Sequence, residues 1–126
     1  MNVFDEQMQM IKNLKYEFYN PKLFEEEFDK VKSKKKILIT IDDGFKSFYE
    51  EAWPYFKVNN IPFILFVSTE PVGNKGYMTW NQLKELEKES FVIIGHHSHT
   101  HEYLIEKSNE DFIKDIEKAN IIFKEK

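Results

Sequence analysis

Three short, almost continuous apolar runs, each ended by polar or turn-forming residues, constrain the fold of this chain more than any other feature. Ile37–Ile41 precedes Asp-Asp-Gly, Pro62–Val67 precedes Ser-Thr-Glu-Pro, and Phe91–Ile94 precedes a glycine. Runs of this length that are apolar on both faces are typical of parallel strands covered on both sides. The sequence therefore predicts three buried parallel strands.

Helical patterns fill the stretches between and after these runs, at residues 47–59, 80–89 and 109–124. Pro54 is expected to break the first stretch and to open a second short helix. The third is expected to bury an apolar stripe formed by Phe112, Ile113, Ile116 and Ile122. Alternating strands and helices predict an α/β fold, either an open sheet or part of a barrel, in which functional groups lie where strands end.

Residues 1–34 are predicted to form an N-terminal helical segment ahead of this unit, which occupies residues 35–126. The apolar side chains of its first helix share one face and are Phe4, Met8, Ile11 and Leu14. A brief strand is expected at residues 16–19, and a second helix at residues 22–32 after Pro21.

The composition excludes several classes of function. A formal net charge of −4 argues against a nucleic-acid backbone as the main partner. All eighteen basic residues are lysines, so bidentate recognition by arginine is absent, and without cysteine there is no thiolate or disulfide chemistry. No apolar run is as long as a membrane span, and the N-terminus lacks the pattern of a signal peptide. The sequence as written therefore predicts a cytoplasmic chain but does not determine its localisation.

The four histidines of the chain fall within six residues, at positions 96, 97, 99 and 101, just after the third apolar run. His97 and His101 have a spacing at which two imidazoles can reach one ion where the chain turns. Taken alone, this segment is also compatible with a solvated polar loop or a tag-like metal-binding sequence, although the spacing favours a ligand pair. The Asp-Asp-Gly after the first run is also ambiguous alone, because Asp-Gly is ordinary turn chemistry.

The two segments become more informative together, because parallel strands end at one edge of a sheet. Two adjacent carboxylates and two imidazoles give a His-His-Asp ligand set and one spare carboxylate. Three protein ligands with an open position are the arrangement of catalytic zinc-type sites. The ion would lower the pKa of a water molecule, and the spare carboxylate would take the water's proton.

These segments resemble the polysaccharide deacetylases, the NodB-homology domain of carbohydrate esterase family four. The family's Thr-Phe-Asp-Asp-Gly motif is similar to Thr40–Gly44, and its His-Ser/Thr-x-x-His motif is similar to His97–His101. Residues 61–67 look like the family's second core strand. The resemblance covers residues 35–104, is expected to continue to the C-terminus, and implies a partial, distorted (β/α) barrel.

The resemblance also implies a role for each matched residue. Asp42 would be the catalytic base. Asp43, His97 and His101 would ligate a divalent metal, with zinc as the first expectation and cobalt or another transition metal as alternatives. The implied reaction is hydrolysis of a carbon–nitrogen amide bond, which removes acetyl groups from an N-acetylated glycan.

Other residues near the strand ends lie outside the implied ligand set. His96 and His99 are expected to face solvent or the groove, and Ser98 is expected to orient a ligating histidine. Tyr77 and Trp80 could stack on a sugar ring, although residues at a helix start more often belong to the core.

The chain departs from the family pattern after His101. Family members supply an arginine motif, an Asp/Trp motif and a late Leu-x-His, whereas this sequence contains no arginine and no later histidine. We therefore expect a truncated domain with weak or no turnover, because loss of a general acid costs about 10²–10⁴-fold in rate. The alternative is a non-catalytic metal-binding fragment that needs a partner to complete its sheet, or that self-associates through open strand edges.

Overall fold

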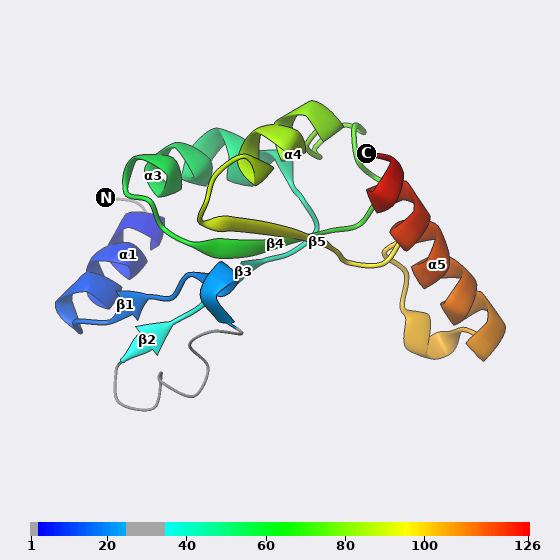
Figure 1. Cartoon of the computed structure of the whole chain (residues 1–126), viewed down its shortest axis with the longest axis horizontal. Helices are drawn as coiled ribbons and strands as arrows, with labels where there is room; N and C mark the ends of the chain where they lie inside the picture. Colours follow the sequence, from blue (N-terminus) through cyan, green and yellow to red (C-terminus); the bar gives the residue numbers. More distant parts are fainter. Residues whose placement is uncertain (1–2, 25–34) are drawn as a thin grey trace.

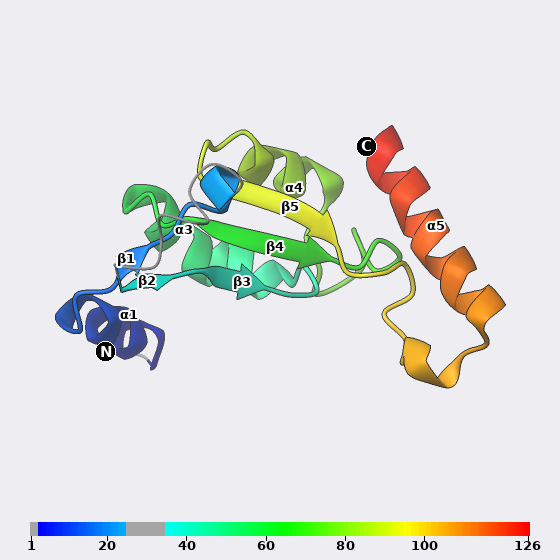
Figure 2. The same ribbon diagram turned by 60° about the horizontal axis from the view of Figure 1, so that its bottom comes forward.

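The computed structural model describes residues 3–24 and 35–126. Its centre is a parallel sheet in the order β3-β4-β5, formed by Ile39–Ile41, Phe63–Val67 and Val92–His96. The carboxyl ends of the three strands therefore share one edge of the sheet (Figures 1 and 2). The predicted parallel strands are confirmed, with two changes: Leu38 interrupts the first run, and the third strand continues through Gly95 to His96.

A two-stranded parallel sheet joins the N-terminal segment to the rest of the chain. β1 (Glu17–Phe18) pairs with β2 (Lys36–Ile37), which precedes β3. Before β1, Met8 is buried in the main core. The second predicted helix of this segment, residues 22–32, lies mostly outside the described residues.

The helical elements of the described residues are α1 (Val3–Asn13), η1 (Pro21–Leu23), η3 (Phe48–Ala52), α3 (Trp53–Val58), α4 (Trp80–Glu87), η4 (Leu104–Glu106) and α5 (Asn109–Glu125). The expected break near Pro54 is present, since the π-helical turn η3 passes into α3 just before the proline. Thr79 and Ser108 each cap the following helix with the side-chain oxygen. Within the described ranges, no helix is both long and apolar enough to cross a membrane.

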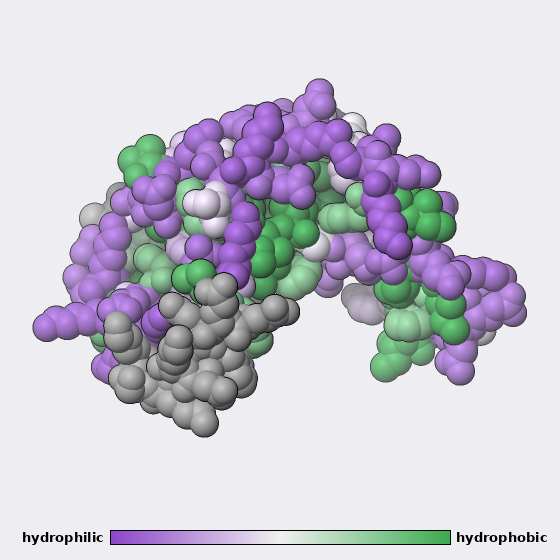
Figure 3. Space-filling model, in the orientation of Figure 1, coloured by the Kyte–Doolittle hydropathy of each residue, from purple (hydrophilic) through white to green (hydrophobic). Residues whose placement is uncertain are grey.

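Helices α3 and α4 cover one face of the sheet (Figure 1). Phe63, Leu65 and Val67 of β4 point into this layer and are completely buried. The opposite face carries Ile64 and Phe66, which are only half-buried, and Figure 3 shows hydrophobic surface in the hollow beneath the sheet. The expectation that both faces are covered is therefore wrong for the described residues, and the fold is an open α/β sheet rather than a closed barrel.

Helix α5 packs differently from the sequence prediction. Phe112 and Ile113 of its apolar stripe are 45% and 52% exposed. The helix instead contacts the rest of the molecule through the buried residues Asp115 and Ala119 and through Phe123. The Phe123 ring lies edge-on to Trp80 and His96 at centroid distances of 5.8 and 5.9 Å. As a result α5 stands beside the carboxyl edge of the sheet (Figure 2).

Candidate metal centre

Asp43 lies on a sharp turn directly after β3. Asp43 and Gly44 have φ angles of +72° and +77°, a left-handed conformation that is uncommon for a non-glycine residue. A Cβ at Gly44 would lie 3.2 Å from Cγ1 of Val67. The glycine therefore allows this turn to pack closely against the end of β4.

His97 and His101 lie on the loop that follows β5. The N–H of His97 donates to the carbonyl of Val67 at 2.8 Å. The start of this loop is therefore held against Val67, the residue beside which Gly44 also lies. Ser98 and His101 have φ angles of +67° and +62°. Oγ of Ser98 accepts a hydrogen bond from the backbone N–H of His101 at 3.3 Å. The Ser98 hydroxyl therefore supports the loop backbone, whereas the sequence had suggested a role in orienting an imidazole.

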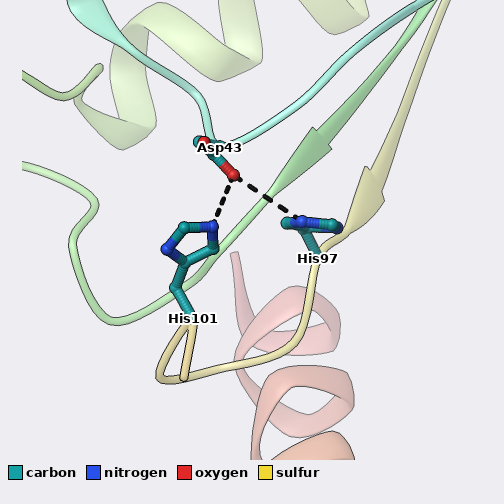
Figure 4. A group of neighbouring side chains, drawn as sticks. All are labelled: Asp43, His97 and His101. Atoms are coloured by element: carbon teal, nitrogen blue, oxygen red, sulfur yellow. Dashed lines mark ion pairs between the residues drawn. The ribbon is translucent and has the colours of Figure 1, made fainter. Parts of the chain in front are cut away.

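The side chains of Asp43, His97 and His101 converge from these two loops (Figure 4). Oδ1 of Asp43 lies 2.8 Å from Nε2 of His101 and 3.7 Å from Nε2 of His97. One potential ligand atom from each residue lies within 4.8 Å of the others. Zinc-type bonds of about 2.0–2.2 Å place neighbouring ligand atoms about 3.3 Å apart in a tetrahedral site. The two observed oxygen–nitrogen distances lie on either side of that value.

The environment of the Asp43 carboxylate also fits a cation. Its Oδ1 is buried, and within the described part of the chain it has no hydrogen-bond partner, despite the short approach of His101. A carboxylate oxygen without a donor, facing two imidazoles, suits a positive ion. These three side chains can hold a divalent metal, and two nitrogens with one oxygen suit zinc and the transition metals near it.

The site opens to solvent on the side of the imidazoles. The side chains of His97 and His101 are 45% and 43% exposed, compared with 18% for Asp43. A cavity of about 800 Å³ adjoins both imidazoles and is also lined by Tyr103 and Leu104. A molecule larger than water can therefore reach the site from this side.

The remaining residues of the predicted site lie outside this cluster. Asp42 is exposed directly after β3 and is not one of the three grouped ligands. His96 is half-buried against Phe123 and lines the cavity, in agreement with a position at the groove. His99 is only 6% exposed, so the expectation that it faces solvent or the groove is wrong. The left-handed backbone at Ser98 turns the chain immediately before His99, so the periodicity of the sequence does not give the direction of this side chain.

A buried polar cluster that was not predicted from the sequence lies beneath the loop. Nδ1 of His99 lies 2.7 Å from Oγ1 of Thr69. The Asp115 carboxylate accepts hydrogen bonds from the N–H of His99 and from the N–H and hydroxyl of Thr100, at 2.7, 3.0 and 2.7 Å. The available signal was a lone carboxylate within the apolar stripe of α5, because a buried carboxylate requires partners.

These hydrogen bonds determine how readily Asp115 takes up a proton. Burial acts to raise the pKa of Asp115, but the bonds donated by the backbone of His99 and by the side chain and backbone of Thr100 outweigh burial. Together they hold the pKa below its ordinary value. Asp115 therefore remains ionised at neutral pH and acts as an acceptor only.

Comparison with known proteins gives one family. Residues 29–126 match the family model described as Polysaccharide deacetylase. The protein YxkH of Bacillus subtilis (strain 168), named provisionally as a polysaccharide deacetylase, is 34% identical over 68 residues, which cover 54% of this chain and 24% of YxkH.

Two solved structures have the same fold. IcaB from Ammonifex degensii superposes with a TM-score of 0.81 at 25% identity, covering 97% of this chain and 59% of that one. The Streptococcus pyogenes deacetylase PplD, in complex with acetate, gives 0.78 at 24% identity and covers 93% and 53%. The chain therefore spans between half and three fifths of these structures and about a quarter of YxkH. Because the family match extends over most of its length, the chain belongs to the polysaccharide deacetylase family.

Proposed function

We propose that this chain forms the metal-binding part of a deacetylase that removes acetyl groups from N-acetylated sugars of a polysaccharide. The observation that carries the proposal is the convergence of Asp43, His97 and His101 at the carboxyl edge of the sheet, in a member of this family. The acetate held by the similar PplD structure is the product expected from such a reaction and supports the proposal.

In this proposal Asp43, His97 and His101 hold the ion, with zinc as the first candidate. The bound ion would supply Lewis-acid chemistry, polarising the acetyl carbonyl and lowering the pKa of a water molecule. Asp42, the neighbour of a ligand, takes the proton of that water as its oxygen attacks the carbonyl carbon. The carbon–nitrogen bond then breaks, acetate leaves, and the sugar nitrogen gains a proton to become an amine.

The open surface around the imidazoles supports a polymeric substrate. His97 and His101 border a cavity of about 800 Å³ that is not enclosed by the described residues, and Tyr103 forms part of its wall. When one sugar of a polymer is bound, the rest of the polymer must extend beyond the site in both directions, which a closed pocket would not permit. A glycan bound along this surface would place one acetamide over the three ligands.

Release of acetate from acetylated chitin oligomers or peptidoglycan, with zinc or cobalt present, tests the proposal. Asp42→Asn keeps the shape of the side chain but cannot take a proton, so we expect its rate to fall at least about 10²-fold. For these 126 residues alone we expect slow turnover, because the sequence has no histidine after His101 to protonate the leaving amine. The assay therefore includes the longest natural chain that contains them. No release by that chain would overturn the function, and unchanged release by Asp42→Asn would remove Asp42 from its role.

A second candidate is metal binding without turnover, in a unit that requires another polypeptide to complete its sheet. The outer edges of β3 and β5 have no pairing strand among the described residues, and one sheet face is only half-buried. Metal binding with no acetate release from either chain would favour this second function.

A further inference from the structure

We infer that Asp115 of α5 is a positioning residue, which holds the loop after β5 in the conformation that directs His97 and His101 towards Asp43. The inference rests on the metal site proposed above. Both imidazoles belong to a loop in which Ser98 and His101 have positive φ angles. Non-glycine residues keep such angles only where their surroundings impose them. The contacts of this loop must therefore supply the restraint.

Asp115 supplies this restraint from one side. Its carboxylate accepts the backbone N–H groups of His99 and Thr100 at 2.7 and 3.0 Å, and the Thr100 hydroxyl at 2.7 Å. Hydrogen bonds to an ionised carboxylate are stronger than those between neutral groups. Asp115 is buried, which limits competition from water. The two restrained amides lie between the two imidazole ligands in the sequence.

The segment after β4 restrains the loop from the other side. The backbone N–H groups of Thr69 and Glu70 donate to the carbonyls of Ser98 and His99 at 3.3 and 3.0 Å. The Thr69 hydroxyl lies 2.7 Å from Nδ1 of the buried His99 ring. The middle of the loop is thus held between α5 and the segment after β4, whereas the imidazoles of His97 and His101 at its two ends are exposed.

The dissociation constant for cobalt(II) or zinc tests this role. Asp115→Asn replaces one acceptor oxygen by an NH₂ donor, so it can no longer accept both amides. We expect binding to weaken about 10- to 100-fold, the usual effect of residues that support a metal ligand. Glu117→Gln, an equal change of charge at an exposed position of α5, should bind like the wild type. Thr100→Val replaces the hydroxyl by a methyl group, which removes its bond to Asp115 and the longer bond, at 3.4 Å, that it accepts from the N–H of Glu102. It should weaken binding about 2- to 10-fold, the effect of losing a hydrogen bond of ordinary strength.

Amide hydrogen exchange of the metal-free protein adds a readout that is independent of the ion. The His99 and Thr100 amides should exchange faster in Asp115→Asn, while the amides of β4 keep their protection. Unchanged affinity in a folded Asp115→Asn variant, or unchanged exchange at these amides, would overturn the inference. If Asp115→Asn does not fold, Thr100→Val decides the question. If the wild type binds no metal, the proposed function fails, and the exchange rates still decide whether Asp115 holds the loop.

Discussion

Oδ1 of Asp43 and Nε2 of His101 lie 2.8 Å apart, although the two residues follow different strands and Oδ1 has no hydrogen-bond partner among the described residues. Because these two atoms are close but do not form a well-directed hydrogen bond, the oxygen and the nitrogen can both bind a metal ion placed between them. His97 approaches the same oxygen at 3.7 Å. The arrangement is suited to one cation shared by three ligands.

Loss of one ligand should abolish strong metal binding. We expect Asp43→Asn and His101→Ala each to raise the dissociation constant of zinc or cobalt more than about 100-fold, because residues that only support a ligand already contribute 10- to 100-fold. Isothermal titration measures the change. Glu102→Gln is the control, since it removes a carboxylate next to His101 that pairs with Lys107 instead. Wild-type affinity in both ligand variants would contradict the site.

Metal should also stabilise the fold, because the unfolded chain does not hold the three ligands together. At a free zinc concentration of 100 times the dissociation constant, the free energy of unfolding should rise by about 2.7 kcal/mol. Thermal unfolding followed by circular dichroism, with and without EDTA, measures this gain. In His97→Ala the gain should disappear, and a gain that persists there would mean that the ion binds elsewhere.

Gly44→Ala should destabilise the protein more than Gly73→Ala. Both glycines have positive φ angles, +77° and +86°, so each substitution carries a left-handed penalty of about 1–2 kcal/mol. A Cβ at Gly44 also meets Val67 at 3.2 Å, whereas at Gly73 it meets nothing within 4 Å. Urea unfolding of the two variants isolates the cost of this contact. Equal losses would show that Val67 can move aside freely.

Asp115 should make the fold sensitive to acid. Its pKa is held below the ordinary value, so the folded protein binds this proton less readily than the unfolded chain does. The resulting stability is complete above the ordinary Asp pKa of about 3.9 and is lost as the pH falls through the lower pKa of the folded state. The difference in unfolding free energy between the wild type and Asp115→Asn should therefore shrink towards acid pH. A difference independent of pH would contradict the ionised role of Asp115.

Phe123→Ala should loosen α5, because this ring packs against Trp80 and His96. We expect a loss of about 1–3 kcal/mol in unfolding free energy, less than the 3–5 kcal/mol typical of a fully buried phenylalanine. Phe112→Ala, at a ring that is 45% exposed on the same helix, should change stability by less than about 0.5 kcal/mol. Urea unfolding of both variants measures the two losses. A larger loss for Phe112→Ala than for Phe123→Ala would show that α5 docks through the face that carries Phe112.

The strands, and the meeting of the Asp-Asp-Gly turn with the histidine segment, could be predicted from local signals. The choice of Asp43 rather than Asp42 as the ligand came from the resemblance to the family. Apolar runs mark parallel strands, and parallel strands place their following residues at one edge of a sheet. The position of His99 could not be predicted in this way. It depends on the left-handed backbone at Ser98 and on hydrogen bonds that the loop donates to Asp115, a residue of α5 that is distant in the sequence.

The packing of α5 and the coverage of the sheet faces could not be predicted from the sequence either. Helical periodicity identified Phe112 and Ile113 as one apolar face, but periodicity does not say what covers a face. The helix docks instead through Asp115, Ala119 and Phe123, which are spaced four residues apart. Ile64 and Phe66 of β4 similarly indicate an apolar face, although the described residues leave both side chains only half-buried.

Val67 contacts both loops that carry ligands, because Gly44 packs near its side chain and His97 donates to its carbonyl. Its strand, β4, lies between β3 and β5, so the carboxylate and the imidazoles start from strands about 9–10 Å apart, two inter-strand spacings. Hydrogen-bonded pairing fixes that span and leaves the loops little freedom to widen or narrow it. The radius of the ion that fits is therefore set by the reach of one aspartate and two histidine side chains across a constant backbone gap.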